Sequence, residues 1–167
     1  NSTVTSPAIT PTTAEDTQTI QSIVDQTGLF PADLVPDLLD PVLTEQTTEF
    51  WRTARIAQEI VGFAYIVPEM LAEGTWNLTA IAIAPSHQRS GTGSVLLNAV
   101  EDHLRTLHQR ILLVDTSSTE DFEMARGFFI RNGYHEEART RAFWAAGGDK
   151  VVFRKALLSS PSKHWQP

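Results

Sequence analysis

Residues 76–93, WNLTAIAIAPSHQRSGTG, join an apolar segment to a loop that contains two glycines. The segment 76–84 is mostly apolar, includes β-branched residues and stops at Pro85, which predicts a central strand covered on both faces. Beyond the loop the period changes, and apolar residues recur at the spacing of a helix, at Leu96, Val100, Leu104 and Leu107. The stretch therefore predicts a strand, a loop and an amphipathic helix in direct succession.

The loop before this helix has the features of an anion-binding site. The first backbone N–H groups of a helix have no partner within the helix, and the helix dipole places about half a positive charge at that end. Gly91 and Gly93 let the main chain approach a ligand, and Arg89 adds a cation. The sequence therefore predicts a site for a phosphate or a diphosphate.

Two common phosphate-binding motifs are excluded by the residues that follow the glycines. A P-loop needs Lys-Ser or Lys-Thr after its second glycine, and this chain has Ser94 and Val95 there. A dinucleotide-binding fingerprint needs a third glycine at position 96, which is Leu96.

The loop 88–93, QRSGTG, resembles the acyl-CoA pyrophosphate loop of the GNAT superfamily of N-acyltransferases, whose pattern is Gln/Arg-x-x-Gly-x-Gly/Ala. A second segment, 125–134 (ARGFFIRNGY), is similar to the family's Phe-Tyr-x-x-x-Gly-Phe/Tyr helix end, and it follows a predicted strand at 111–115 and a loop at 116–118. Residues 149–157 look like the family's last strand. The resemblance spans most of residues 8–158.

The order of the predicted elements gives an α/β fold in which a mixed, mostly antiparallel sheet carries helices on both faces. This is also the fold that the resemblance implies. The elements are a strand at 8–10, helices at 13–28 and 32–43, a hairpin at 50–57 and 60–67, the central strand, the helix after the loop, a strand at 111–115, a helix at 120–132, and strands at 134–143 and 150–157. Gly62, inside a predicted strand, indicates a bulge or a close approach.

Length and composition fit one globular domain, which we place at 8–158, with flexible tails rich in Ser, Thr and Pro at 1–7 and 159–167.

The formal net charge of −7 disfavours a general nucleic-acid binder and is compatible with a cationic amine substrate. The chain has no cysteine, which excludes disulfides and thiolate chemistry, and its five histidines show no metal-binding spacing. No apolar run is long enough to span a bilayer and no secretion signal is present, so we expect a cytoplasmic protein without a membrane partner.

The resemblance implies acetyl-CoA as the co-substrate, bound mainly by main-chain groups. Residues of the central strand would hold the pantetheine arm and the acetyl carbonyl, and residues 88–94 would hold the pyrophosphate. The cofactor-binding residues that it implies are Ile81, Ala82, Ile83, Gln88, Arg89, Ser90, Gly91, Thr92, Gly93, Ser94, Thr116 and Phe129. No metal site is implied.

The chain departs from the family at two catalytic positions. The tyrosine that usually protonates the leaving thiolate falls on Phe129, and the position where several members place a carboxylate base is Asn77. One interpretation is that a remote carboxylate, Glu73 or Glu69, acts through water, so the catalytic candidates are Glu73 and Asn77. Two others are a slow enzyme and an acyl-CoA pocket that has lost catalysis.

The resemblance thus predicts an N-acetyltransferase in which a primary amine of a small molecule or peptide attacks the thioester directly. The alternative is a catalytically weak or inactive acyl-CoA-binding module that serves regulation or interaction, and a third interpretation is a structural domain with an incidental anion loop. The segments 28–45, 68–74 and 134–150 would form the acceptor site and show no familiar motif. The apolar last strands permit a homodimer.

Overall fold

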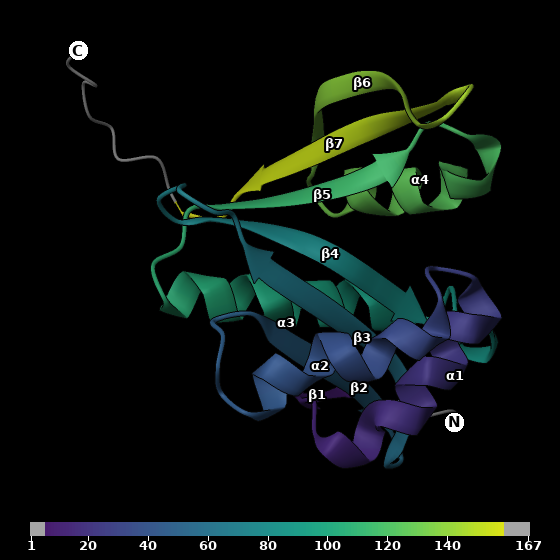
Figure 1. Cartoon of the computed structure of the whole chain (residues 1–167), viewed down its shortest axis with the longest axis vertical. Helices are drawn as coiled ribbons and strands as arrows, with labels where there is room; N and C mark the ends of the chain where they lie inside the picture. Colours follow the sequence, from purple (N-terminus) through teal and green to yellow (C-terminus); the bar gives the residue numbers. More distant parts are fainter. Residues whose placement is uncertain (1–5, 159–167) are drawn as a thin grey trace.

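The computed structural model describes residues 6–158, so the predicted tails lie outside the described residues except for positions 6 and 7 (Figure 1). Its elements follow the predicted order. They are β1 (Ala8–Pro11), α1 (Thr17–Thr27), α2 (Val35–Leu43), β2 (Phe50–Ile56), β3 (Glu59–Pro68), β4 (Thr75–Ile83), α3 (Thr92–Thr106), β5 (Ile111–Ser117), α4 (Glu123–Arg131), β6 (His135–Ala145) and β7 (Gly148–Ala156). Single 3-10 turns precede the helices, at Ala14–Asp16, Ala32–Leu34, Pro85–His87 and Glu120–Phe122.

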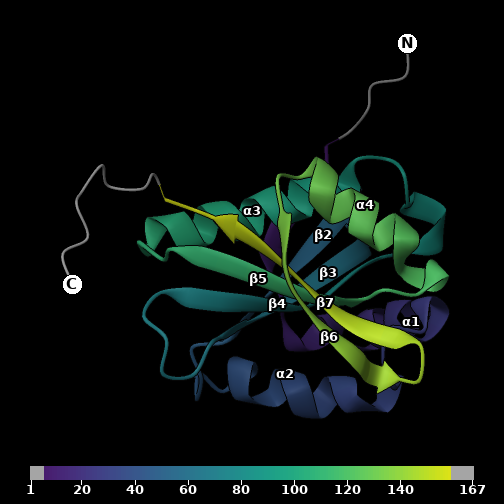
Figure 2. The same cartoon turned by 90° about the horizontal axis from the view of Figure 1, so that it is seen from above.

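The strands form one sheet in the order β1-β2-β3-β4-β5-β7-β6. All neighbouring strands are antiparallel except β4 and β5, which run parallel. The helices α1 and α2 cover one face of the sheet, and α3 and α4 cover the other (Figure 2). The predicted fold class is therefore confirmed.

Each face of the sheet has its own hydrophobic core. On the α3 side, Leu96 and Leu104 pack with Trp76 and Leu78 of β4. On the α1 and α2 side, helix residues such as Ile20, Val35 and Leu39 pack with Ala80 and Ala82. The residues of β4 thus change face between Leu78 and Ala80.

A β-bulge explains this change of face. Tyr65 of β3 pairs with Ala80 and Ile66 pairs with Leu78, so Thr79 is an extra residue in β4. An extra residue shifts the alternation of side chains by one position. As a result Ile81 and Ile83, like Leu78, lie toward the α3 side.

The parallel strands β4 and β5 pair with each other only along their first residues. Their pairing covers residues 75–78 and 111–114, whereas β4 continues to Ile83 and β5 to Ser117. Beyond the last pair the two strands diverge (Figure 1). We call this opening the fork, with its apex at Leu78 and Val114.

The structure corrects the predicted end of one strand and shows how the chain is arranged at Gly62. Thr116 and Ser117, predicted as a loop, belong to β5 because they pair with Val151 and Lys150 of β7. At Gly62 the ladder shifts register nearby, and a Cβ would lie 2.5 Å from Cδ1 of Ile83. Both the predicted bulge and the predicted close approach therefore occur there.

A buried carboxylate joins α3 to the segment after α4. Glu101 is 1% exposed, and its two oxygens accept hydrogen bonds from the hydroxyl of Tyr134 (2.6 Å) and from Nζ of Lys155 (2.9 Å). Lys155 also donates to the carbonyl of Asn132. Burial and the charge of Glu101 raise the pKa of Tyr134, so this hydroxyl stays protonated as a donor.

Within residues 6–158, no helix is both long and apolar enough to cross a bilayer. The same residues contain no group of three or more histidine, aspartate and glutamate side chains placed to hold a metal ion.

Candidate active site

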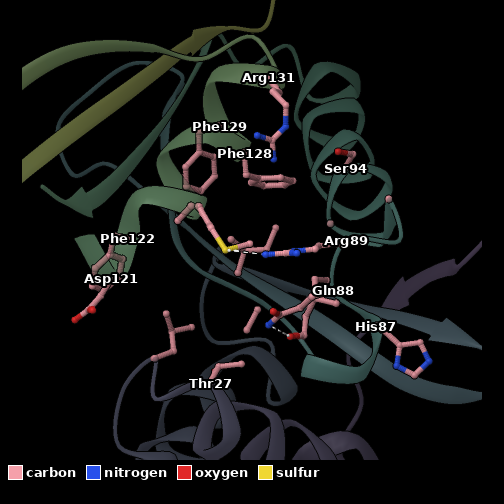
Figure 3. Close-up of a pocket in the computed structure, with 18 residues that line it drawn as sticks. Thr27, His87, Gln88, Arg89, Ser94, Asp121, Phe122, Phe128, Phe129 and Arg131 are labelled. Atoms are coloured by element: carbon pink, nitrogen blue, oxygen red, sulfur yellow. Dashed lines mark hydrogen bonds between the residues drawn. The ribbon is translucent and has the colours of Figure 1, made fainter. Parts of the chain in front are cut away.

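A cavity of about 690 Å³ lies at the open end of the fork. Its walls come from the end of α1, from β4, from the loop before α3 and from α4 (Figure 3). The residues that line it are Thr27, Leu29, Ile81, Ala82, Ile83, His87, Gln88, Arg89, Gly91, Gly93, Ser94, Asp121, Phe122, Met124, Ala125, Phe128, Phe129 and Arg131.

The loop between β4 and α3 is held by its own side chains. Nε2 of Gln88 donates to the carbonyl of Ile83, and the hydroxyl of Ser90 donates to the carbonyl of His87. Arg89 has a φ of 63°, in the left-handed region, and its Nη2 lies 3.6 Å from the sulfur of Met124 across the cavity (Figure 3). The guanidinium therefore lies at the cavity, and the residue stays exposed to solvent.

Helix α3 presents its N-terminus to the same cavity. Gly91 caps the helix with a φ of 85°, and Gly91, Gly93 and Ser94 line the cavity. The N–H groups of the first turn have no acceptor within the helix, and the dipole of this 15-residue helix favours an anion there. The arrangement is suited to a phosphate group whose charge Arg89 also neutralises.

Packing leaves little room for a side chain at position 93. A Cβ there would lie 3.1 Å from Cε2 of Phe128 and 3.7 Å from Cγ1 of Ile83. This close approach brings the first turn of α3 against α4 and β4 at the cavity wall.

The apolar part of the cavity is formed by branched residues of β4 and aromatic residues of α4. Ile81 and Ile83 contribute from the strand, and Phe128 and Phe129 from the helix. Phe129 is 3% exposed, and its ring lies 5.3 Å from that of Phe128 and 5.8 Å from that of Tyr134, between ring centroids. No hydroxyl stands at position 129 to donate a proton.

Most of the residues that the resemblance assigned to the cofactor line this cavity, but three do not. The hydroxyls of Ser90 and Thr92 are hydrogen-bonded to each other and shape the loop. Thr116 is buried in β5, and its carbonyl accepts a hydrogen bond from Nε1 of Trp144.

The two catalytic candidates lie away from the cavity. Asn77 precedes the bulge, so its side chain is on the face of the sheet that α1 and α2 cover, where Nδ2 lies 3.5 Å from a carboxylate oxygen of Asp115. Glu73 is exposed and precedes β4 at the end remote from the cavity, where its carbonyl accepts from Arg110. A role for Glu73 through water stays a prediction.

Sequence reasoning missed the walls that α1 and α4 contribute, such as Leu29, Phe122 and Met124. The large apolar residues Phe122 and Met124, in a segment otherwise rich in acidic residues, were the available signal. Arg126 of α4 donates to the carbonyls of Ser117, at the end of β5, and of Thr119.

A sequence model of the acetyltransferase (GNAT) family matches residues 18–134, which is more than half of the chain. The chain belongs to the GNAT acetyltransferase family. The family resemblance and the enzyme class, an acyltransferase, are therefore confirmed. No curated protein matches the chain.

Solved structures agree with this assignment. A GNAT-family protein from Desulfovibrio desulfuricans is 30% identical to this GNAT acetyltransferase, with a TM-score of 0.85 over 92% of this chain and 100% of its own. The ribosomal-protein-S18-alanine N-acetyltransferase of Escherichia coli is 16% identical, with a TM-score of 0.76 over 96% and 99% of the two chains. An aminoglycoside 6'-N-acetyltransferase complexed with coenzyme A is 14% identical, with a TM-score of 0.77 over 93% and 99%. The last two share the fold alone.

We expect the Phe129→Tyr variant of this GNAT acetyltransferase to keep its affinity for acetyl-CoA within about threefold. The change adds one oxygen atom at the wall of a cavity of about 690 Å³ and leaves the loop and the first turn of α3 as they are. Calorimetric titration of both proteins checks the expectation, and a loss of about tenfold, or about 1.4 kcal/mol, would contradict it.

Proposed function

We propose that this protein transfers the acetyl group of acetyl-CoA to a primary amine of a small molecule or peptide. The observation that carries the proposal is the continuity of one cavity from the N-terminus of α3 to the fork. A diphosphate and an extended thioester arm require these two features at the same site.

In this proposal the main chain does most of the cofactor binding. The first turn of α3 and Arg89 hold the pyrophosphate. The arm follows the segment 81–83, whose edge toward β5 has no strand partner beyond Leu78. The acetyl group then lies near the bulge at Thr79, where a backbone N–H can polarise its carbonyl.

The transfer itself is a direct attack by the neutral amine on the thioester carbon. The N–C bond forms, the C–S bond breaks, the amine loses a proton and the thiolate gains one. With phenylalanine at position 129, the thiolate takes its proton from solvent. A thiol with an ordinary pKa of about 8.5 does not need a side-chain proton donor, because its thiolate is a tolerable leaving group near neutral pH.

The distribution of charge favours a cationic acceptor. Residues 1–51 carry eight of the chain's 20 acidic residues and none of its 13 lysines and arginines. They include α1 and α2, which cover the face of the sheet opposite α3 and α4. The resulting field attracts an amine that carries several positive charges, such as a polyamine.

We expect salt to weaken the binding of such an acceptor. Raising the ionic strength from about 0.05 M to about 0.5 M shortens the Debye length roughly threefold, so the KM of a polyamine should rise several-fold. The KM of a simple monoamine should change much less under the same conditions. Steady-state kinetics with the two acceptors checks this, and equal salt dependence would contradict a role for the acidic face.

Two experiments test the proposed function. Calorimetry with acetyl-CoA tests the cofactor site, and absence of binding at millimolar concentration would rule it out. A thiol-release assay with acetyl-CoA and a panel of amines, polyamines, amino acids and peptides tests the transfer.

A second candidate function is that of an acyl-CoA-binding module without catalysis. Asn77 and Phe129 favour it, because neither side chain can transfer a proton at the positions where the family usually places titrating groups. Acetyl-CoA binding without thiol release for any amine would support this candidate, and clear turnover would exclude it.

A further inference from the structure

Asp115 occupies the first position of β5 beyond the apex of the fork. Val114 is the last residue of β5 that pairs with β4, and Asp115 follows it. Among the described residues of β4 and β5 it is the one carboxylate. Its side chain is 31% exposed, which leaves its oxygens open to a ligand.

The side chain of Asp115 lies on the face of the sheet opposite the cofactor cavity. Val114 is buried in the core on the α3 side, so its neighbour in the strand faces the other way. Asn77 does the same in β4, and its Nδ2 lies 3.5 Å from Oδ2 of Asp115. The carboxylate and the amide therefore flank the apex of the fork from the α1 and α2 side.

An amine already lies beside this carboxylate. Nζ of Lys150, from β7, is 3.6 Å from Oδ2 of Asp115 and 4.6 Å from the centroid of the Phe143 ring. A carboxylate and an aromatic face are the two groups that hold a protonated amine most readily. The strands around the fork thus form a place where an ammonium group is stabilised.

We propose that Asp115 binds the ammonium group of the acceptor and takes one of its protons, so that the neutral amine can attack acetyl-CoA. The inference rests on the proposed function. The amine reaches the thioester through the fork from the α1 and α2 side, while the cofactor arm lies on the α3 side. One proton of the ammonium group passes to the carboxylate, which leaves a neutral amine as the nucleophile. As the N–C bond forms and the C–S bond breaks, the nitrogen loses its second proton to solvent, and coenzyme A leaves as its thiolate and takes a proton from solvent.

Other carboxylates near the acceptor face are less suited to this role. Glu49 accepts a hydrogen bond of 2.6 Å from the hydroxyl of Tyr65, which occupies one of its oxygens. Glu73 precedes Leu78, at the apex, by five residues, which is about 16 Å along an extended strand. Asp115 follows the apex directly.

Within the sheet, the contacts of Asp115 include one charged group. From β7, Val152 is its partner in the ladder and Lys150 contributes the ammonium. From β4, Asn77 and Thr79 are uncharged at all accessible pH values. A pH effect at this position therefore reports on Asp115, Lys150 and the acceptor.

The Asp115→Asn variant tests the proposal. We expect kcat/KM for the amine to fall about 100-fold or more, within the range for loss of a general base, while the affinity for acetyl-CoA is unchanged. The deficit should shrink as the pH rises toward the pKa of the amine, because an amine that arrives neutral needs no base. Asp115→Glu should recover part of the activity. Asp102→Asn, at an exposed position on α3 outside the cavity, is the matched control and should behave like the wild type.

A Lys150→Gln variant tests the same carboxylate without altering it. Because Lys150 competes with the acceptor for Asp115, its removal should lower the KM of the acceptor several-fold. An unchanged KM for the acceptor in Lys150→Gln would overturn the proposal. So would a kcat/KM of Asp115→Asn within about twofold of the wild type, or a deficit of Asp115→Asn that does not change with pH. In these cases thiol release by the wild type would leave the proposed function intact, whereas a wild type that acetylates no amine would overturn both.

Discussion

The Gly93→Val variant is expected to lose acetyl-CoA binding almost completely, with an affinity reduced about 100-fold. A Cβ at position 93 already lies 3.1 Å from the ring of Phe128, and the two methyl groups of valine would need still more space. The ring lines the cavity, so a displacement of the ring changes the shape of the cavity wall. The cost of such overpacking is about 1–3 kcal/mol, and 1.4 kcal/mol corresponds to tenfold in affinity.

The measurement is a calorimetric titration with acetyl-CoA, accompanied by a thermal melt that confirms a folded protein. A folded Gly93→Val variant that binds acetyl-CoA as tightly as the wild type would contradict the proposed position of the diphosphate.

A matched pair of glycines provides the control. Gly91 and Gly147 both have positive φ, 85° and 80°, and a Cβ at either would meet no atom within 4 Å. Alanine at either position therefore carries a similar backbone strain of about 1 kcal/mol. We expect Gly91→Ala to weaken acetyl-CoA binding because it caps α3, and Gly147→Ala, in the turn between β6 and β7, to leave it unchanged.

The Glu101→Ala variant is expected to lower the free energy of unfolding by about 3–5 kcal/mol, the range for breaking a buried ion pair. Removal of this carboxylate leaves the buried hydroxyl of Tyr134 without its acceptor and leaves the ammonium of Lys155 without its anionic partner, with the carbonyl of Asn132 still bound. Arg105, 3.8 Å from the same carboxylate, also loses its partner.

Denaturant unfolding of the two proteins checks this expectation. Asp102→Ala is the control, because Asp102 is the next residue of α3, is 73% exposed and pairs with Arg105 at the surface. Its loss should cost less than about 1 kcal/mol. A similar loss for the two variants would contradict the structural role of Glu101.

The sequence was sufficient to predict the strand, loop and helix that form the proposed cofactor site. The change from a run of buried residues at 76–84 to helical spacing after Gly93 marks the boundary without any tertiary information. The order of elements and the turns at glycines then led to the fold class. These features depend on local patterns, which a sequence carries directly.

The features that escaped prediction depend on contacts between distant segments. The strand at 111–115 was predicted to stop at Asp115, but pairing with β7 extends it by two residues. The parallel register of β4 and β5 brings Asn77 next to Asp115, and the bulge at Thr79 places Ile81 and Ile83 on the α3 side. Neither feature can be derived from alternation within one strand. A single charged residue at the end of an apolar strand was the available signal for Asp115.

Phenylalanine stands at position 129, where the family usually has a tyrosine, and its surroundings in the structure are apolar. Phe129 packs among aromatic rings at the cavity wall, so the ring completes the hydrophobic core whether or not it carries a hydroxyl. Loss of the hydroxyl therefore removes a proton donor and keeps the cavity. This is why we expect cofactor binding and catalysis to respond differently to changes at this residue.

The most direct test of the account is the thiol-release assay with acetyl-CoA and a panel of monoamines and polyamines, measured across pH. The account predicts turnover that rises with pH as the amine loses its proton, and a higher kcat/KM for polyamines than for monoamines. Demonstrated binding of acetyl-CoA without thiol release for any amine would contradict it and would identify the protein as an acyl-CoA-binding module.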